Sequence, residues 1–313
     1  MIYLKKFELL DTRKEQLCLD GRTIYTDYYP LEIFPKKELN NIEFDNITIL
    51  YGGNGSGKTT LLNIIANRIN ATRKNYNNKG TIFDRYVNLC DFTMSMDYPY
   101  EIKFISSDDI FDYLLDLRAI NNNVNRRKDD LSQEWLNTKY NENITNIFDY
   151  EEIKRDKDAK KKSMSNYIRN RLVNNNISEK SNGESSLMYW QRDINENGIY
   201  ILDEPENSLS AENQLKLKKY IEDSSRYYNC QFIISTHSPF LLALEEAKIY
   251  DLDSYPTIVK KYYELDSIKT YYNFFKEREN DFKWNFTYFY KIFFLNKNIV
   301  YFSKKIQITV YFF

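Results

Sequence analysis

Glycine, cysteine and histidine are all scarce in this chain, and long apolar runs are absent. Its 313 residues include only 8 glycines, 3 cysteines and 1 histidine. The cysteines (Cys18, Cys90 and Cys230) share no short spacing, which excludes a zinc site of paired cysteines and a disulfide framework. This usage predicts a reducing, cytoplasmic location. No uncharged apolar run reaches about 18 residues, so we expect no membrane-spanning helix.

The chain also lacks an excess of charge of either sign. It carries 44 Lys and Arg against 45 Asp and Glu, so no global field attracts it to nucleic acid or to anionic lipid. Hydrophobic residues make up 42% of the chain, which is enough for a sizeable core and excludes global disorder. The length predicts one large domain that carries an insertion or a tail.

The few glycines are concentrated in one place. Four of the 8 lie between Gly52 and Gly57, in a segment that matches the phosphate-loop (Walker A) pattern G-x-x-x-x-G-K-[ST]. Glycine lets successive backbone N–H groups approach a phosphate without a clash from Cβ. The alternative is a plain glycine-rich turn. We predict that the loop binds ATP through Gly53, Asn54, Gly55, Ser56, Gly57, Lys58, Thr59 and Thr60.

The sequence on either side of the loop has the context that a phosphate loop needs. Ile47–Tyr51 is a β-branched apolar run that predicts a buried strand, and Leu61–Ile69 has the apolar spacing of a helix. A helix that begins after the loop adds unpaired N–H groups and the positive end of its dipole. We expect Lys58 to reach the β- and γ-phosphates, and the Thr59 hydroxyl to bind Mg²⁺.

Two carboxylates follow a second apolar run. Asp203 and Glu204 come directly after Gly198–Leu202, which predicts another buried strand, and Pro205 follows them. A carboxylate in this position can hold Mg²⁺, often through water, and we assign this role to Asp203. Glu204 is placed to polarise an attacking water. Without the phosphate loop, the same pair would indicate only a solvated strand end.

The single histidine, His237, follows a third apolar run that ends at Ser235. The carboxyl ends of parallel strands converge at one edge of a sheet, where ligands bind. We therefore expect His237 to hydrogen-bond the γ-phosphate and the attacking water, and predict that Glu204, His237 and Lys58 form the catalytic set. The alternative is a histidine with a structural role alone.

Four segments stand in the order found in ABC-type ATPases. They are the Walker A loop at Gly52–Thr60, a signature motif at Ser181–Ser185, the Walker B segment at Leu202–Pro205 and the switch histidine at Ser235–His237. The stretches LDEPENSLS and STHSPFLL resemble the cytosolic branch that contains RecF, the SMC-type proteins and the OLD-type ATPases. Over roughly residues 1–280 the chain looks like a stand-alone member of this branch, of the kind often called an AAA-family or AAA_21-like ATPase.

This resemblance implies an α/β fold of the ABC-type P-loop NTPase class. Such a fold has a mostly parallel core sheet, an antiparallel N-terminal flank and a helical insertion. The resemblance also implies an ATP-dependent homodimer in which two subunits, head to tail, sandwich two Mg-ATP molecules. In that arrangement Ser181 and Gly183 of one subunit would contact, in trans, the ATP held by the other.

The chain departs from the family pattern in three places. In the signature, Lys180 replaces the usual Leu and Asn182 replaces the first Gly. The stretch Ser208–Ser210 lacks the Asp that transporters have after Walker B. The family's Gln after a middle strand, which helps to bind Mg²⁺ and water, is also missing. The polar side chains at the corresponding place are Ser106, Ser107 and Asp108.

These three residues either substitute for the missing Gln or cap the helix that we expect over residues 110–118. The residue that stacks on the adenine ring is likewise not decided by the sequence. Tyr29 and Phe34 are both candidates for stacking on it, and the sequence does not choose between them.

We predict one ATPase domain over residues 1–282 and leave the aromatic and basic tail, 283–313, unassigned. Residues 1–50 are expected to form short strands, broken at Pro30 and Pro35, that flank the core sheet. A segment at about 107–180 has no Gly or Pro and many charges, which predicts a helical insertion.

Two further segments suggest contacts of other kinds. The run Lys154–Arg171 has eight basic and two acidic residues, and is the best candidate for contact with a nucleic-acid backbone. The alternative is a solvated helix face. The D-x-D pattern at Asp251 and Asp253 is typical of Toprim-type metal nucleases, but too few residues follow His237 for such a domain. We therefore assign no nuclease role to these acids.

The sequence favours an ATP-hydrolysing enzyme with a DNA-related or defence role. One alternative is a slow, ATP-gated switch or clamp for nucleic acid or for an unidentified protein partner. Another is the ATPase subunit of a membrane transporter, which the missing Gln and the missing Asp after Walker B argue against.

Overall fold

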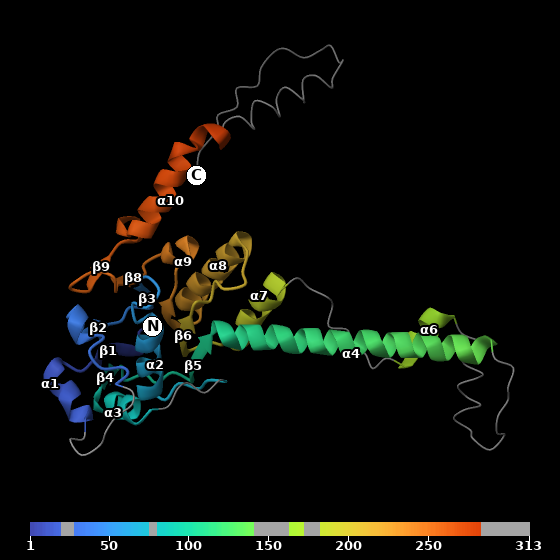
Figure 1. Ribbon diagram of the computed structural model, residues 1–313, viewed down its shortest axis with the longest axis horizontal. Helices are drawn as coiled ribbons and strands as arrows, with labels where there is room; N and C mark the ends of the chain where they lie inside the picture. Colours follow the sequence, from blue (N-terminus) through green and yellow to red (C-terminus); the bar gives the residue numbers. More distant parts are fainter. Residues whose placement is uncertain (20–27, 75–79, 141–162, 172–181, 283–313) are drawn as a thin grey trace, which may run out of the picture. The chain divides into compact units, whose positions relative to one another are not determined.

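A computed structural model describes residues 1–19, 28–74, 80–140, 163–171 and 182–282 of the chain (Figure 1). The chain divides into two compact units, Met1–Tyr262 and Tyr263–Phe313. The first unit holds every segment with a predicted role in catalysis. The second contributes helix α10 (Asp266–Glu277), and the unassigned tail lies outside the described residues.

Six strands form the central sheet of the first unit, in the order β5-β6-β7-β3-β8-β9. They are β3 (Ile47–Tyr51), β5 (Glu101–Ser106), β6 (Gly198–Asp203), β7 (Gln231–Ser235), β8 (Lys248–Asp251) and β9 (Ile258–Lys260). Neighbours from β5 to β8 pair in parallel, whereas β9 pairs antiparallel with β8. Every residue of β3, β6 and β7 is buried, as is usual for parallel strands covered on both faces. The mostly parallel core sheet is therefore confirmed.

A second sheet forms the antiparallel flank. Its strands are β1 (Leu4–Glu8), β2 (Asn41–Glu43) and β4 (Asp91–Met94), in the order β2-β1-β4. Both pairings are antiparallel, so the predicted N-terminal flank is confirmed.

The expectation of strands throughout residues 1–50 is wrong for the described part between β1 and β2. This stretch holds helix α1 (Thr12–Glu15) and the 3₁₀ turns η1 (Gln16–Cys18) and η2 (Pro35–Lys37). The carboxylate of Asp11 accepts the backbone N–H of Lys14 at 2.7 Å and caps α1. Pro35 stands in the first turn of η2, where its missing N–H is tolerated. Local caps and proline thus favour helical turns over strands here.

The other helices of the first unit alternate with the strands of the core sheet (Figure 1). They are α2 (Lys58–Arg68), α3 (Thr81–Leu89), α4 (Ser107–Tyr140), α6 (Met164–Arg171), α7 (Asn182–Asp193), α8 (Ala211–Tyr227) and α9 (Pro239–Leu242). The helices predicted near residues 61–69 and 110–118 correspond to α2 and to part of α4.

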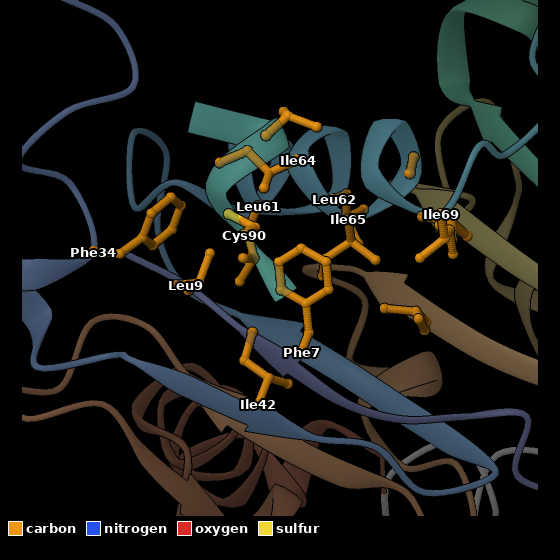
Figure 2. Packing of buried hydrophobic residues seen from close by; sticks show 14 of the residues in the cluster. Phe7, Leu9, Phe34, Ile42, Leu61, Leu62, Ile64, Ile65, Ile69 and Cys90 are labelled. Carbon is orange, nitrogen blue, oxygen red and sulfur yellow. The ribbon is translucent and has the colours of Figure 1, made fainter. Parts of the chain in front are cut away.

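Helix α2 lies in the main hydrophobic core. Figure 2 shows its side chains beside Phe7 of β1 and Ile42 of β2, and the same cluster includes Ile201 and Ile233 of the core sheet. Helix α2 therefore packs against both sheets, and burial of each large apolar side chain stabilises it by about 1.5–3 kcal/mol. This packing fixes the helix whose first turn forms the end of the phosphate loop. Its fully buried residues are Leu61, Leu62, Ile64, Ile65 and Ala66.

One buried amide connects the two sheets. Gln231, the first residue of β7, accepts the N–H groups of Tyr3 and Leu4 at 3.0 and 2.8 Å. Its Nε2 donates to the carbonyl oxygens of Leu4 and Asp45 at 2.8 and 3.2 Å. All four hydrogen bonds of this amide are therefore made inside the protein, and they hold the flank against the core sheet.

The described part of the predicted insertion is helical. Helices α4 and α6 pack together through a small cluster of their own, formed by Leu131, Trp135 and Tyr167. The Tyr167 hydroxyl donates to Glu134 at 3.0 Å. Helix α4 follows β5 without a gap, so it extends directly from the core sheet.

Candidate functional site

The phosphate loop follows β3 and ends in the first turn of α2. Gly55 and Gly57 have φ of 80° and 95°, in the left-handed region that glycine adopts without a steric penalty. Gly57 is also the N-cap of α2, so the free N–H groups of that turn face the loop. This geometry matches the cradle that a phosphate needs.

Lys58 is almost completely buried beneath the loop, with 5% of its surface exposed. Its Nζ donates to the carbonyl oxygens of Gly52 and Gly53 at 2.8 and 3.1 Å. Burial lowers the pKa of Lys58, and the charge of Glu204, followed by that of Asp203, opposes this shift. The ammonium group thus lies in the combined field of the acids predicted from the sequence.

Asp203, at the end of β6, is brought against the loop. Its Oδ1 accepts a hydrogen bond from the Thr59 hydroxyl at 3.2 Å and another from the Ser235 hydroxyl. Ser235 is its register partner on β7. Burial raises the pKa of Asp203, and these two hydroxyl groups partly offset that shift.

A carboxylate beside a hydroxyl is a suitable donor set for Mg²⁺. Among the described residues, no cluster of three or more His, Cys, Asp or Glu side chains has metal-binding geometry. Because Mg²⁺ usually takes most of its ligands from phosphates and water, the two side chains, Thr59 and Asp203, fit such an ion without a larger protein cage.

Glu204 turns sharply away from β6. Its φ of 49° lies in the left-handed region, which is unusual for a residue with a side chain and is often found at functional sites. Its N–H donates to the Ser235 carbonyl at 3.0 Å, and its Oε2 accepts from Asn207 at 3.1 Å. About a third (32%) of the side chain is exposed, so the carboxylate remains accessible to water.

His237 faces Glu204 across the strand ends. Its Nε2 lies 3.6 Å from Glu204 Oε1, which is longer than a hydrogen bond. The structure therefore brings Lys58, Thr59, Asp203, Glu204 and His237 to one edge of the sheet. The sequence predicted that these residues meet.

Glu206 is a further residue of this site that the sequence did not single out. Its Oε1 accepts the N–H groups of His237 and Ser238 at 2.6 and 3.1 Å. Burial raises the pKa of Glu206, and the hydrogen bond from His237 acts in the opposite direction. The available signal was a third acid directly after Pro205, and the structure shows that this acid holds the histidine segment.

The two aromatic candidates for the adenine ring differ in exposure. Phe34 is fully buried in the main core (Figure 2) and presents no face to a ligand. Tyr29 is 37% exposed, its hydroxyl donates to Thr60 Oγ1 at 3.0 Å, and its ring stacks on Phe83 at 5.8 Å. The structure thus leaves Tyr29 as the candidate beside the phosphate loop.

Comparison with known proteins identifies the family. A family model described as "ABC transporter" matches residues 39–207, which is more than half of the chain. The chain belongs to this family. A second model, described as "AAA ATPase domain", matches residues 186–242. The protein is therefore an ATP-binding P-loop ATPase of the ABC type.

Solved structures show distant similarity to this ABC-type ATPase. An inward-facing ABC transporter of the metal-chelate type is 15% identical, with a TM-score of 0.31 and coverage of 72% of this chain and 76% of that one. The SMC head domain from Thermotoga maritima is 13% identical, with a TM-score of 0.29 and coverage of 80% and 94%. No curated protein matches significantly. None of the described helices has the length and apolar character that a membrane span needs.

The place of the missing ABC-family Gln is occupied by a helix cap. The N–H and hydroxyl of Ser106 both donate to Asp109 Oδ2 at 2.8 Å, and the Asp109 N–H donates to Ser106 Oγ at 3.3 Å. This reciprocal arrangement is a capping box at the start of α4. Ser106 pairs in register with Asp203, so the cap lies on the same sheet edge as the site.

The structure places only part of the predicted signature and basic run. Gly183 lies in the first turn of α7, whereas Ser181 is outside the described residues. Of the basic run, Met164–Arg171 forms α6, and residues 154–162 are outside the described part. After Walker B, the Ser210 hydroxyl caps α8 by accepting the Asn213 N–H.

Proposed function

We propose that this ABC-type ATPase hydrolyses Mg-ATP as a head-to-tail homodimer in the cytoplasm, and that it belongs to the RecF/SMC/OLD-like branch. One observation carries the catalytic part of this proposal. The phosphate loop after β3, the acid pair after β6 and the histidine after β7 meet at one sheet edge, with Thr59 Oγ1 3.2 Å from Asp203 Oδ1.

Each side chain then has one role. The Lys58 ammonium balances the charge of the phosphates, and Thr59 and Asp203 hold Mg²⁺, which when bound neutralises charge on the phosphate oxygens. Glu204 accepts a hydrogen bond from the attacking water and orients it. His237 donates to the γ-phosphate through Nε2, an atom that has no hydrogen-bond partner among the residues that the structure describes.

Catalysis by this set is mostly positioning and charge stabilisation. The supporting contacts are already made. Ser235 holds both Asp203 and the N–H of Glu204, and Glu206 holds the N–H of His237. Because these hydrogen bonds already hold the side chain of Asp203 and the backbone of Glu204 and His237, they limit the rearrangement that the reaction requires.

The second subunit would complete the site through the signature segment. Gly183 lies at the start of α7, where a helix has free N–H groups and a positive dipole end. In the proposed dimer this end, with Ser181, faces the phosphates bound by the other copy. A DNA-related or defence role fits the branch that we propose, with an unidentified protein as a possible further partner.

The test is the substitution Glu204→Gln, which removes the carboxylate base but keeps the size of the side chain. We expect the variant to bind ATP, to lose turnover and to show the mass of a dimer when ATP is present. The control is Glu212→Gln on α8, whose side chain is 78% exposed and which should keep wild-type turnover. Wild-type turnover in Glu204→Gln would refute the role of Glu204, and a monomer with ATP bound would refute the dimer.

A second candidate is a slow, ATP-gated binding module. The observation that favours it is the capping box of Ser106 and Asp109, which occupies the place of the Gln that helps to bind Mg²⁺ and water. Turnover measured with and without duplex DNA separates the two functions. Salt-sensitive DNA binding that is lost when Lys160–Lys162 are neutralised would favour a nucleic-acid clamp. Co-purification with a membrane subunit would instead favour a transporter.

A further inference from the structure

Asp253 contacts the phosphate loop from the side opposite to the catalytic acids. Its Oδ2 accepts the backbone N–H of Gly53 at 2.7 Å. We propose that Asp253 is a positioning residue that fastens the Walker A loop to the end of β8 and so keeps the loop in the shape that receives a triphosphate. The proposed chemistry gives this residue no other role.

The position of Asp253 follows from strand order. Strand β8 is the parallel neighbour of β3, and their register ends at the pair Tyr51 and Asp251. One residue further, the Leu252 N–H donates to the Tyr51 carbonyl at 2.8 Å. The Leu252 carbonyl in turn accepts a hydrogen bond from Lys37 Nζ. Asp253 therefore emerges beside the first glycine of the loop, on a backbone that is held from both sides.

The turn that carries Asp253 is organised by Asp251, whose carboxylate is almost completely buried. It accepts the Asp253 N–H at 3.0 Å, the Ser254 hydroxyl at 2.7 Å and Lys260 Nζ at 2.6 Å. These bonds, with Lys260 first, hold the pKa of Asp251 below its usual value despite the burial. The D-x-D pattern is thus a structural unit, in which one acid fixes the turn and the other reaches the loop.

Both the N–H and the carbonyl group of Gly53 make hydrogen bonds. Lys58 Nζ donates to its carbonyl at 3.1 Å, and Asp253 accepts from its N–H at 2.7 Å. In the proposed function Lys58 turns to the phosphates and releases the carbonyl, whereas the hydrogen bond that the Gly53 N–H donates to Asp253 can remain. The carboxylate also packs closely on the loop, since a Cβ added to Gly52 would lie 3.2 Å from its Oδ1.

Two substitutions separate the hydrogen bond from the charge. Asp253→Asn keeps an oxygen that can accept the Gly53 N–H and removes a negative charge that repels phosphate. Asp253→Ala removes both. If the bond is what matters, the Ala variant loses the fastening and the Asn variant keeps it.

The first measurement is amide hydrogen exchange of the nucleotide-free protein. We expect faster exchange across residues 51–58 in Asp253→Ala and wild-type exchange in Asp253→Asn. The second measurement is the Kd of Mg-ATP, which should rise about three- to tenfold in the Ala variant and should not rise in the Asn variant. The control is Asp116→Ala, which removes an exposed acid of α4.

Unchanged loop exchange in Asp253→Ala would overturn the proposal, and so would an Asn variant that behaves like the Ala variant in both measurements. The ATP measurement rests on the proposed function, whereas the exchange measurement does not. A wild-type protein that fails to bind ATP would therefore contradict the proposed function, while loop exchange would still decide the role of Asp253.

Discussion

Replacement of Gly57 by Ala gives the sharpest test of the phosphate-loop geometry. Gly57 has φ of 95°, and a left-handed conformation costs alanine about 1–2 kcal/mol. The added Cβ would also lie 3.1 Å from Ile33 Cγ2 and 3.6 Å from the Phe34 ring. The close contact is with Ile33, which is partly buried and packs against the main core, so overpacking adds about 1–3 kcal/mol. The expected loss of unfolding free energy is therefore about 2–5 kcal/mol.

Two neighbouring glycines provide matched controls for this substitution. Gly55 has φ of 80°, but an added Cβ there would meet no atom within 4 Å, so Gly55→Ala should lose only the backbone component of about 1–2 kcal/mol. Gly53 does not have positive φ, and its nearest neighbour would lie at an ordinary 3.5 Å. Gly53→Ala should therefore be neutral, or slightly stabilising through a less flexible unfolded chain.

The assay is thermal unfolding without nucleotide, which excludes any effect of ATP binding on stability. For chains of about 150–250 residues, 1 kcal/mol corresponds to about 2–4 °C in Tm. The expected order of Tm is Gly53→Ala highest, then Gly55→Ala, then Gly57→Ala. If Gly57→Ala melts at or above the temperature of Gly55→Ala, the contact with Ile33 and Phe34 does not constrain the loop, and the reasoning is wrong.

Two predictions concern the acids Glu206 and Asp203. Glu206→Gln keeps an acceptor for the His237 N–H, whereas Glu206→Ala leaves this N–H unpaired, although the Ser238 N–H still donates to Thr236 Oγ1. Thermal unfolding should show a loss of about 1–3 kcal/mol for Ala relative to Gln, and equal Tm values would contradict this role. Burial raises the pKa of Asp203 in the folded state above its ordinary 3.8. Between the unfolded-state pKa and the folded-state pKa, the folded protein therefore binds more protons than the unfolded protein. The wild type consequently loses stability as the pH rises through this window. Asp203→Asn should therefore gain Tm relative to wild type as the pH rises above 3.8 without nucleotide, and a relative loss on raising the pH would contradict the effect of burial on Asp203.

The sequence was sufficient for the parts of the site that are encoded locally. The phosphate loop could be predicted because glycine is almost absent elsewhere, and because a β-branched run precedes the loop and a helical pattern follows it. The ends of β6 and β7 were also predictable, since each is a short apolar run that stops at polar residues. These strand ends were expected to lie close together because the carboxyl ends of parallel strands share one edge of the sheet.

Contacts that depend on strand order could not be predicted in the same way. Asp253 and Gly53 are 200 residues apart, and they meet because β8 is the neighbour of β3, which no local pattern specifies. The D-x-D pattern at Asp251 and Asp253 resembles that of metal nucleases in residue type alone, and residue type does not indicate the contact with Gly53. Glu206 was missed for a similar reason, since its bond to His237 joins two segments that are contiguous only in the folded sheet.

The strand order also separates the two sides of the phosphate loop by function. Strand β3 lies between β7 and β8. The side of β7 and β6 supplies Asp203, Glu204 and His237, which are proposed to act on the reacting phosphate and water. The side of β8 supplies Asp253, whose carboxylate accepts the Gly53 N–H of the loop. Changes on the β8 side should therefore alter the affinity for ATP more than turnover at saturating ATP. Changes on the β6 and β7 side should alter turnover even when ATP is bound.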